Sequence, residues 1–139
     1  MKLMIDSNIL IFSNVAEMPE HDMARDRLLA LINDGHSFAV NTIIVSEVNF
    51  KLQKILNGEE AYERTMSLLH SNHIDYYPVD QNTLENAIEL NHRQKMRIND
   101  AVIAQHCLDM RLDGIFTDNV RDFKRVPGLH IVPLREDNR

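Results

Sequence analysis

The chain has 139 residues, of which 44% are hydrophobic and 26% are charged, a composition typical of a globular protein with a sizeable core. Its 15 basic and 21 acidic residues give a net charge of −6, which argues against a broad basic surface that tracks phosphates. It does not argue against a nuclease whose acidic residues bind metal. The single cysteine, Cys107, excludes an intramolecular disulfide.

No apolar run reaches the length of a membrane span, and the N-terminus lacks the pattern of an export signal. The sequence therefore predicts a cytoplasmic protein. Four glycines and four prolines are scattered without a linker-like stretch, so we expect a single domain over residues 1–139.

The N-terminal segment Leu3-Met4-Ile5 predicts a short buried strand that runs directly into Asp6. Residues 8–15 follow as a short helix or turn. Apolar positions at helical spacing predict a helix over residues 22–33, which Asp34-Gly35 ends.

The middle of the chain alternates strands and helices. Residues 37–41 predict a second strand, and Thr42 is the expected N-cap of a helix that carries Glu47. The pattern then predicts a helix, a strand and another helix, over residues 59–69, 75–79 and 82–95.

The last third contains a helix that is apolar almost all round, which predicts burial. We expect Asn99 to cap it and Asp100 to lie in its first turn. Two short strands follow, at residues 115–116 and 130–132. The alternation of strands and helices predicts an α/β fold with a central parallel sheet and right-handed crossovers.

Four carboxylates fall near strand exits or nearby helix starts. They are Asp6, Glu47, Asp100 and Asp118. In an α/β sheet these points face one edge, so the four are predicted to share a cleft. Their mutual repulsion would be relieved by Mg²⁺ or Mn²⁺, which favour oxygen ligands and can activate a water to attack a phosphodiester.

Each of the four also has an ordinary structural explanation. Asp6 and Asp118 fit turns or caps, and Glu47 fits an exposed helix face. Asp100 fits a helix N-terminus, where a negative charge is favourable by about 0.3–1 kcal/mol. The metal-site hypothesis therefore depends on the four acting together.

Four segments, taken together, resemble the PIN-domain family, and especially the VapC-type toxins of prokaryotic toxin–antitoxin pairs. The segments are Met4-Ile5-Asp6-Ser7-Asn8, Ser46-Glu47-Val48, the stretch 98–104 around Asp100, and the stretch 116–123 that begins Phe116-Thr117-Asp118-Asn119. The resemblance implies a Rossmann-like three-layer sandwich and a Mg²⁺- or Mn²⁺-dependent endoribonuclease. It also implies an antitoxin partner and, commonly, a homodimer.

The resemblance assigns metal-binding roles to Asp6, Glu47 and Asp100. The family's fourth position lies in a Thr-x-(Asp or Asn) motif, so Asn119 takes the place of the usual aspartate and Asp118 lies one position early. Both residues stay candidates for that position. Thr117 would orient the carboxylates through its hydroxyl. Asn8 is a candidate for a residue that supports the metal ligands without binding the metal itself.

Seven of the 15 basic residues lie between Arg93 and Arg125, on either side of Asp100 and Asp118 in the sequence. They form either solvated helix faces or a basic rim that binds RNA phosphates. Arg97, three residues before Asp100, is the candidate for substrate binding. Cys107 is interpreted as a buried apolar residue because no activating partner is evident.

Two other classes of function fit parts of the pattern. A receiver-type signalling module gathers acids around Mg²⁺, but it needs adjacent acids after the first strand and a late lysine. The residues around Asp6 and just after Phe116 lack these features. A PIN scaffold that binds RNA or a partner without cutting is the second alternative.

Overall fold

Five strands form one parallel sheet in the computed structural model of this chain, which describes residues 1–136. Their spatial order is β3-β2-β1-β4-β5. The strands are β1 (Lys2–Ile5), β2 (Ser37–Asn41), β3 (Ile74–Tyr77), β4 (Gly114–Thr117) and β5 (Ile131–Pro133). The predicted α/β fold with a central parallel sheet is confirmed.

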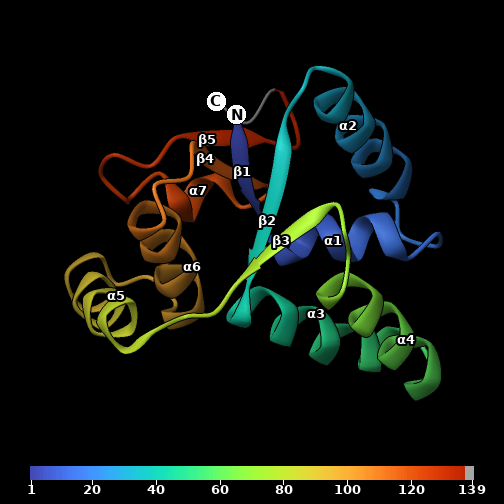
Figure 1. Cartoon of the computed structure of the whole chain (residues 1–139), viewed down its shortest axis with the longest axis horizontal. Helices are drawn as coiled ribbons and strands as arrows, with labels where there is room; N and C mark the ends of the chain where they lie inside the picture. The colour runs from blue at the N-terminus through green and yellow to red at the C-terminus, as the bar shows by residue number, and fades with distance from the viewer. Residues whose placement is uncertain (137–139) are drawn as a thin grey trace.

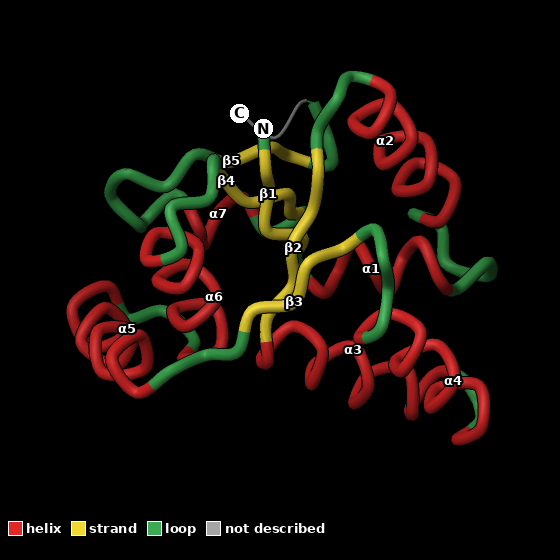
Figure 2. The backbone as a smooth tube through the Cα atoms, viewed as in Figure 1, coloured by secondary structure: helices red, strands yellow, loops and turns green. Residues whose placement is uncertain are grey.

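Helices cover both sides of this sheet (Figures 1 and 2). They are α1 (Ser7–Asn14), α2 (His21–Asn33), α3 (Thr42–Ile55), α4 (Gly58–Leu69), α5 (Gln81–Gln94), α6 (Ile98–Asp109) and α7 (Val120–Phe123). Figure 1 shows α5 and α6 on one side of the sheet and α1 and α2 on the other, while α3 and α4 extend beyond the end of β2. Between residues 1 and 136, no helix has the length and apolar character that crossing a membrane requires.

The order of the strands reverses between β1 and β4. The chain first builds outward from β1 to β2 and β3, and then returns to add β4 and β5 on the opposite side. Ile5 pairs with Phe116, so β1 and β4 end side by side. In open α/β sheets, ligands bind beyond the carboxyl ends of the strands at such a reversal.

The start of β4 requires a glycine. A Cβ atom at Gly114 would lie 2.6 Å from the backbone oxygen of His130, closer than the two atoms can approach. That oxygen accepts a hydrogen bond from Ile115 N at 2.9 Å. Gly114 therefore allows the chain leading into β5 to pair closely with β4.

The core consists of the central strands and the buried helix. Leu3, Met4 and Ile5 of β1 are at most 1% exposed, as expected for a strand covered on both faces. Helix α6 buries seven of its residues, which confirms the prediction made from its apolar sequence. Leu29 and Ile32 of α2, by contrast, are more than half exposed, although their spacing placed them in the apolar set of that helix.

Two predicted caps are wrong. Asn41, not Thr42, caps α3, because its Oδ1 accepts a hydrogen bond from Ile44 N at 2.9 Å. Asn99 lies inside α6, whose N-cap is Arg97. At α3 the Thr42 hydroxyl instead contacts Tyr76 and the backbone N–H of Val79. Among residues 1–136, no side chain caps the start of α6, and Asn99 donates to Glu47. The short α7 has no counterpart among the predicted elements.

Candidate metal centre

Asp6 is buried at the end of β1, where the strand passes into α1. Its Oδ1 accepts a hydrogen bond from Ser7 N at 2.8 Å, and its Oδ2 accepts one from the Thr117 hydroxyl at 2.6 Å. Burial raises the pKa of Asp6 to about 6, and the charges of Asp100 and Glu47 add to this effect against the two hydrogen bonds. Asp6 therefore lies in the field of two other carboxylates.

Glu47 reaches this place from α3, and its side chain is only 10% exposed. Its Oε1 accepts a hydrogen bond from the Ser7 hydroxyl at 3.2 Å. Its Oε2 accepts one from Arg97 Nη2 at 3.2 Å and one from Asn99 Nδ2 at 3.4 Å. The structure thus turns Glu47 inward, a placement that the neighbouring sequence left open.

Asp100 enters from the first turn of α6 and is 4% exposed. Burial raises its pKa, Arg97 opposes the shift, and Glu47 adds to it. Asn119 Nδ2 donates a hydrogen bond to Asp100 Oδ2 at 3.4 Å. Asp6, Glu47 and Asp100, from three separate elements, form what we call the acidic cluster, with Asn119 at its edge.

Asp118 faces elsewhere. Its two carboxylate oxygens accept hydrogen bonds from Arg135, at 2.9 Å from Nε and 3.2 Å from Nη2. Arg135 also contacts Glu20, at 3.4 Å. The backbone N–H of Asp118 donates to Asn8 Oδ1 at 3.3 Å. Of the two candidates for the fourth position, only Asn119 has its side chain on the acidic cluster.

Three other predicted residues surround the acidic cluster. Thr117 is fully buried, and its Oγ1 also accepts a hydrogen bond from Asn119 N at 2.8 Å, which orients the start of α7. Asn8 is joined to the turn after β4 through Asp118. Arg97 stands at the outer rim with a side chain that is 62% exposed.

The donor set fits a hard divalent cation. As the side chains stand, no three His, Cys, Asp or Glu residues between positions 1 and 136 are close enough to enclose a metal ion. All three carboxylates accept hydrogen bonds, Asp6 and Glu47 from Ser7, Thr117, Arg97 and Asn99, and Asp100 from Asn119. The cluster nevertheless offers only oxygen ligands in a buried, anionic place, the chemistry that Mg²⁺ and Mn²⁺ prefer.

Ser7, Asn99 and Arg135 were not predicted as parts of this site. The position of Ser7 beside Asp6 was a usable signal. Asn99 was expected to cap its helix but donates to Glu47 instead. Arg135 lies 17 positions after Asp118, and no local pattern in the sequence connects the two.

A second buried polar contact joins the end of β2 to α6, away from the acids. Asn41 Nδ2 lies 3.0 Å from His106 Nδ1, and both residues are at most 2% exposed. Asn41 Oδ1 accepts from Ile44 N, so its Nδ2 donates and the ring nitrogen accepts. Burial lowers the pKa of His106. Next to it, burial raises the pKa of Cys107 to about 12, which agrees with its interpretation as an inert core residue.

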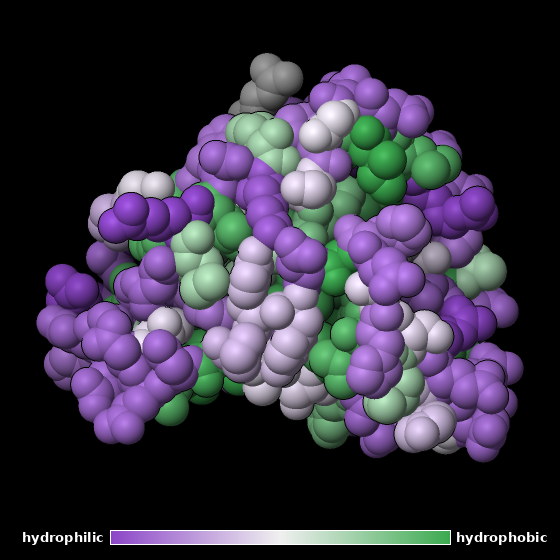
Figure 3. Space-filling model, in the orientation of Figure 1, coloured by the Kyte–Doolittle hydropathy of each residue, from purple (hydrophilic) through white to green (hydrophobic). Residues whose placement is uncertain are grey.

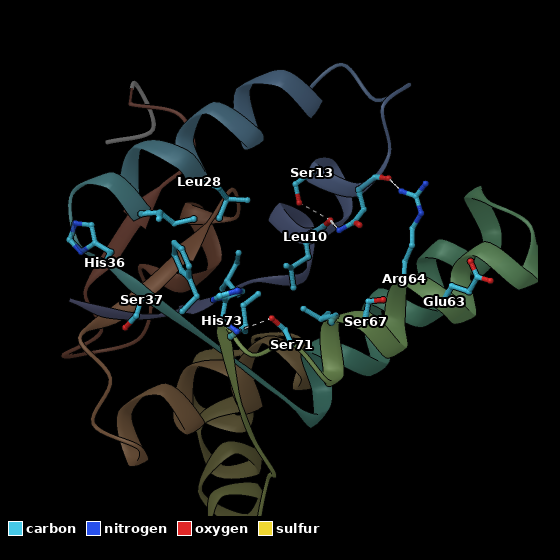
Figure 4. Close-up of a pocket in the computed structure, with 16 residues that line it drawn as sticks. Leu10, Ser13, Leu28, His36, Ser37, Glu63, Arg64, Ser67, Ser71 and His73 are labelled. Atoms are coloured by element: carbon cyan, nitrogen blue, oxygen red, sulfur yellow. Dashed lines mark hydrogen bonds between the residues drawn. The ribbon is translucent and has the colours of Figure 1, made fainter.

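A large hollow lies apart from the acids. It is a groove of about 750 Å³ with a chiefly apolar lining that includes Leu10, Leu28, Ile32, Phe38, Leu68 and Ile74. Figure 4 shows His36 and Ser37 at one end and Glu63 and Arg64 at the other. Figure 3 shows apolar residues in this part of the surface, between more hydrophilic flanks. No residue of the acidic cluster lines the groove.

Comparisons with known proteins agree on one family. The PIN domain matches residues 3–129. Ribonuclease VapC6 of Methanocaldococcus jannaschii is 26% identical to this chain, over 92% of the chain and 94% of that protein.

Solved structures share the fold. VapC20 of Mycobacterium tuberculosis, described as a Sarcin-Ricin loop cleaving toxin, has a TM-score of 0.78 at 16% identity over 94% of this chain and 98% of its own. VapBC2 of Rickettsia felis, solved bound to a DNA fragment from its promoter, has a TM-score of 0.74 at 20% identity over 96% and 98%.

Proposed function

This chain belongs to the PIN-domain family, and on that premise we propose that it is a metal-dependent endoribonuclease, the toxin of a toxin–antitoxin pair. We place it in the cytoplasm, with residues 1–139 acting as a single domain. The observation that carries the proposal is the acidic cluster itself. Three carboxylates from separate elements meet at the reversal of the sheet, where burial and the charges of Asp100 and Glu47 raise the pKa of Asp6.

The acidic cluster would hold Mg²⁺ or Mn²⁺ through Asp6, Glu47 and Asp100. When bound there, such a cation supplies Lewis-acid stabilisation of the charge that develops on the phosphoryl group during hydrolysis. Glu47 and Asp6 would exchange some of their present hydrogen bonds for the metal. The overall reaction adds water to phosphorus and breaks one P–O bond of the RNA backbone.

The neighbours of the acids keep them oriented. Thr117 fixes Asp6 through the bond at 2.6 Å, and Ser7 and Asn99 hold the two oxygens of Glu47. Such outer contacts set the direction of each ligand, and their loss typically weakens metal binding about 10- to 100-fold.

We assign the fourth position to Asn119 rather than Asp118. The Asn119 amide lies at Asp100, whereas both oxygens of Asp118 are paired with Arg135. The amide oxygen of Asn119 is a metal-ligand candidate after rotation of the amide group. Asp118 and Asn8 then support the turn that positions Asn119.

Arg97 is the proposed contact for an RNA phosphate. Its exposed guanidinium reaches Glu47 at 3.2 Å, so it stands beside the position of the scissile group. A guanidinium binds phosphate oxygens in pairs. It would neutralise Glu47 before substrate binds and turn to the phosphate afterwards.

The partner we propose is an antitoxin protein. A solved structure from Klebsiella pneumoniae with the same fold is a toxin–antitoxin complex. The groove of Figure 4 offers a continuous apolar surface that is separate from the acidic cluster, so a bound partner could inhibit only by extending to the acids or by excluding RNA. We also propose a homodimer, as is common in the family.

The test is cleavage of a mixed RNA pool by the purified chain with Mg²⁺, with Mn²⁺ and with a chelator. We expect metal-dependent cutting that Asp100→Asn lowers by more than about 100-fold, since a direct ligand should matter at least as much as its supports. Asp118→Asn is the matched control, because it removes a carboxylate one residue from the cluster's edge. It should retain most of the activity.

Two results would contradict the proposal. Equal cutting by the wild type and Asp100→Asn would mean that the activity belongs elsewhere. Absence of any Mg²⁺ or Mn²⁺ binding by calorimetry would favour the non-catalytic PIN scaffold. A loss in Asp118→Asn as large as in Asp100→Asn would overturn the assignment of the fourth position to Asn119.

A further inference from the structure

A smaller pocket lies between α1 and α3, and we call it the α1–α3 pocket. Its volume is about 270 Å³ and its lining is chiefly apolar. Residues that line it include Asn8, Phe12, Met18, Lys51, Lys54 and Ile55. The floor is therefore apolar and aromatic, and two lysines stand at the rim.

The α1–α3 pocket adjoins the acidic cluster along both of its helices. Asn8 follows Asp6 by two residues, at the start of α1. Lys51 lies one helical turn beyond Glu47 on α3, so the two side chains share a face of that helix. The pocket lining therefore begins within one helical turn of Asp6 on α1 and of Glu47 on α3.

The charge of the rim suits a polyanion. Within residues 1–136, neither Lys51 nor Lys54 forms a salt bridge, although the chain as a whole carries a net charge of −6. Lys54 Nζ instead lies over the ring of Phe50, 4.3 Å from its centroid. In the larger groove of Figure 4, by contrast, Arg64 is paired with Glu60 at 3.7 Å.

We propose that the α1–α3 pocket is a nucleobase subsite, which holds the base of a nucleotide next to the scissile phosphate. Lys51 and Lys54 would bind the backbone phosphates at its rim. The inference rests on the proposed function and adds to it a place where the RNA sequence is read.

Size and chemistry favour a single base as the occupant. Proteins read single-stranded RNA by stacking splayed-out bases on aromatic side chains beside cationic residues. Phe12, which is half-buried in the pocket wall, offers such a ring. A pocket of about 270 Å³ suits one small planar group better than a whole α-helix, which is about 10–12 Å across.

The test measures RNA binding by the full chain carrying Asp100→Asn, in Mg²⁺. Two fluorescein-labelled probes are compared, a short single-stranded RNA of mixed sequence and an abasic oligoribonucleotide of equal length. Phe12→Ala should weaken binding of the RNA about 5- to 100-fold, and it should not weaken binding of the abasic probe, which has no base to stack. Phe12→Leu, which keeps an apolar side chain, should show the same selectivity with a smaller loss.

The lysines give an independent readout. Lys51→Gln should weaken binding of both probes and reduce the slope of log affinity against log salt by about 0.7. Arg111→Gln is the matched control, since it removes one positive charge at the far end of α6. It should leave affinity and salt slope nearly unchanged. Thermal denaturation of each variant checks that the fold is kept.

The proposal is overturned if the Phe12 variants weaken both probes equally, or neither probe, or if the chain binds no RNA. A partner-protein site would give the second of these results. Failure of the proposed function looks different. If the wild type binds RNA in a Phe12-dependent manner but does not cut it, the subsite stands and hydrolysis does not. If the wild type cuts RNA and Phe12→Leu has an unchanged KM, the subsite is wrong and the ribonuclease stands.

Discussion

Helix α6 carries two buried polar residues in different electrostatic environments, one near other negative charges and one in a neutral pair. Asp100, near its start, faces Glu47 and belongs to a group of like charges. His106, six residues later, is neutral and paired with Asn41 at 3.0 Å. Both are at most 4% exposed, yet burial raises the pKa of Asp100 and lowers that of His106.

The difference separates a binding site from a structural contact. Between residues 1 and 136, no buried side-chain nitrogen or oxygen lacks a hydrogen-bond partner, so hydrogen bonding alone does not distinguish the two. What distinguishes them is charge. The Asn41–His106 pair is neutral and complete, whereas the acidic cluster holds three carboxylates that a cation would stabilise.

The sharpest way to test this contrast is to remove a charge from the acidic cluster. Asp6 has a pKa of about 6 in the folded chain and about 3.9 when unfolded. As the pH falls, the folded state therefore binds a proton at Asp6 before the unfolded state does. This protonation stabilises the fold below about pH 4, and the stabilisation is lost as the pH rises from about 4 to 6. Asp6→Asn should make the metal-free protein about 2–3 kcal/mol more stable at pH 7 and no more stable at pH 4.

The measurement is urea denaturation in a chelator at both pH values. The Ser7 N–H can still donate to the amide oxygen at position 6, so the cap of α1 is kept. Asp118→Asn is the control with the opposite sign, since it breaks the pair with Arg135. If Asp6→Asn is less stable than the wild type at pH 7, the contrast between the acidic cluster and the Asn41–His106 pair is wrong, because the carboxylate would then stabilise the fold.

The Asn41–His106 pair should respond in the other direction. His106→Leu removes the acceptor of Asn41 Nδ2 and leaves that buried group unpaired. We expect a loss of about 1–3 kcal/mol in the free energy of unfolding. Calorimetric titration with Mn²⁺ should show nearly unchanged metal affinity, because the acids keep their own contacts.

The double variant Asn41→Ala with His106→Leu checks the cause. If the unpaired amide is responsible, the two changes together should cost less than the sum of the single changes. Additive losses, or a large fall in metal affinity in His106→Leu, would show that the pair positions the acids and is not a separate structural contact.

The smallest predicted effect concerns Thr117, which is a structural residue by its burial but also donates a hydrogen bond to the acidic cluster. Thr117→Val keeps the shape of the side chain but removes the bond to Asp6 at 2.6 Å. We expect metal affinity to fall at least about tenfold. The midpoint of thermal denaturation in chelator should fall by about as much as in Thr65→Val, because the bond from Asn119 N is lost as well. Thr65→Val is the matched control, because Thr65 is also buried and donates a hydrogen bond, but to Ala61 O within α4. Unchanged metal affinity in Thr117→Val would remove Thr117 from the site.

The sequence by itself determined the strands and helices whose apolar residues recur at regular spacing. The apolar run before Asp6 predicted a parallel sheet that is covered on both faces. The helix around Asp100, which is apolar almost all round, predicted that α6 is buried. The alternation of strands and helices then placed Asp6, Glu47 and Asp100 near one edge. These predictions succeed because periodic hydrophobicity and sheet topology depend on local residue spacing and on general rules of strand connection.

Only the tertiary structure decided which way the side chains at the ends of elements point. Asn41 rather than Thr42 caps α3, Asn99 donates to Glu47 rather than capping α6, and Asn119 rather than Asp118 meets the acidic cluster. Where a strand or helix ends, the backbone leaves its periodic path, and neighbouring polar residues compete for the same role. Contacts from distant segments, such as that of Arg135 with Asp118, settle the competition, and no local pattern encodes them.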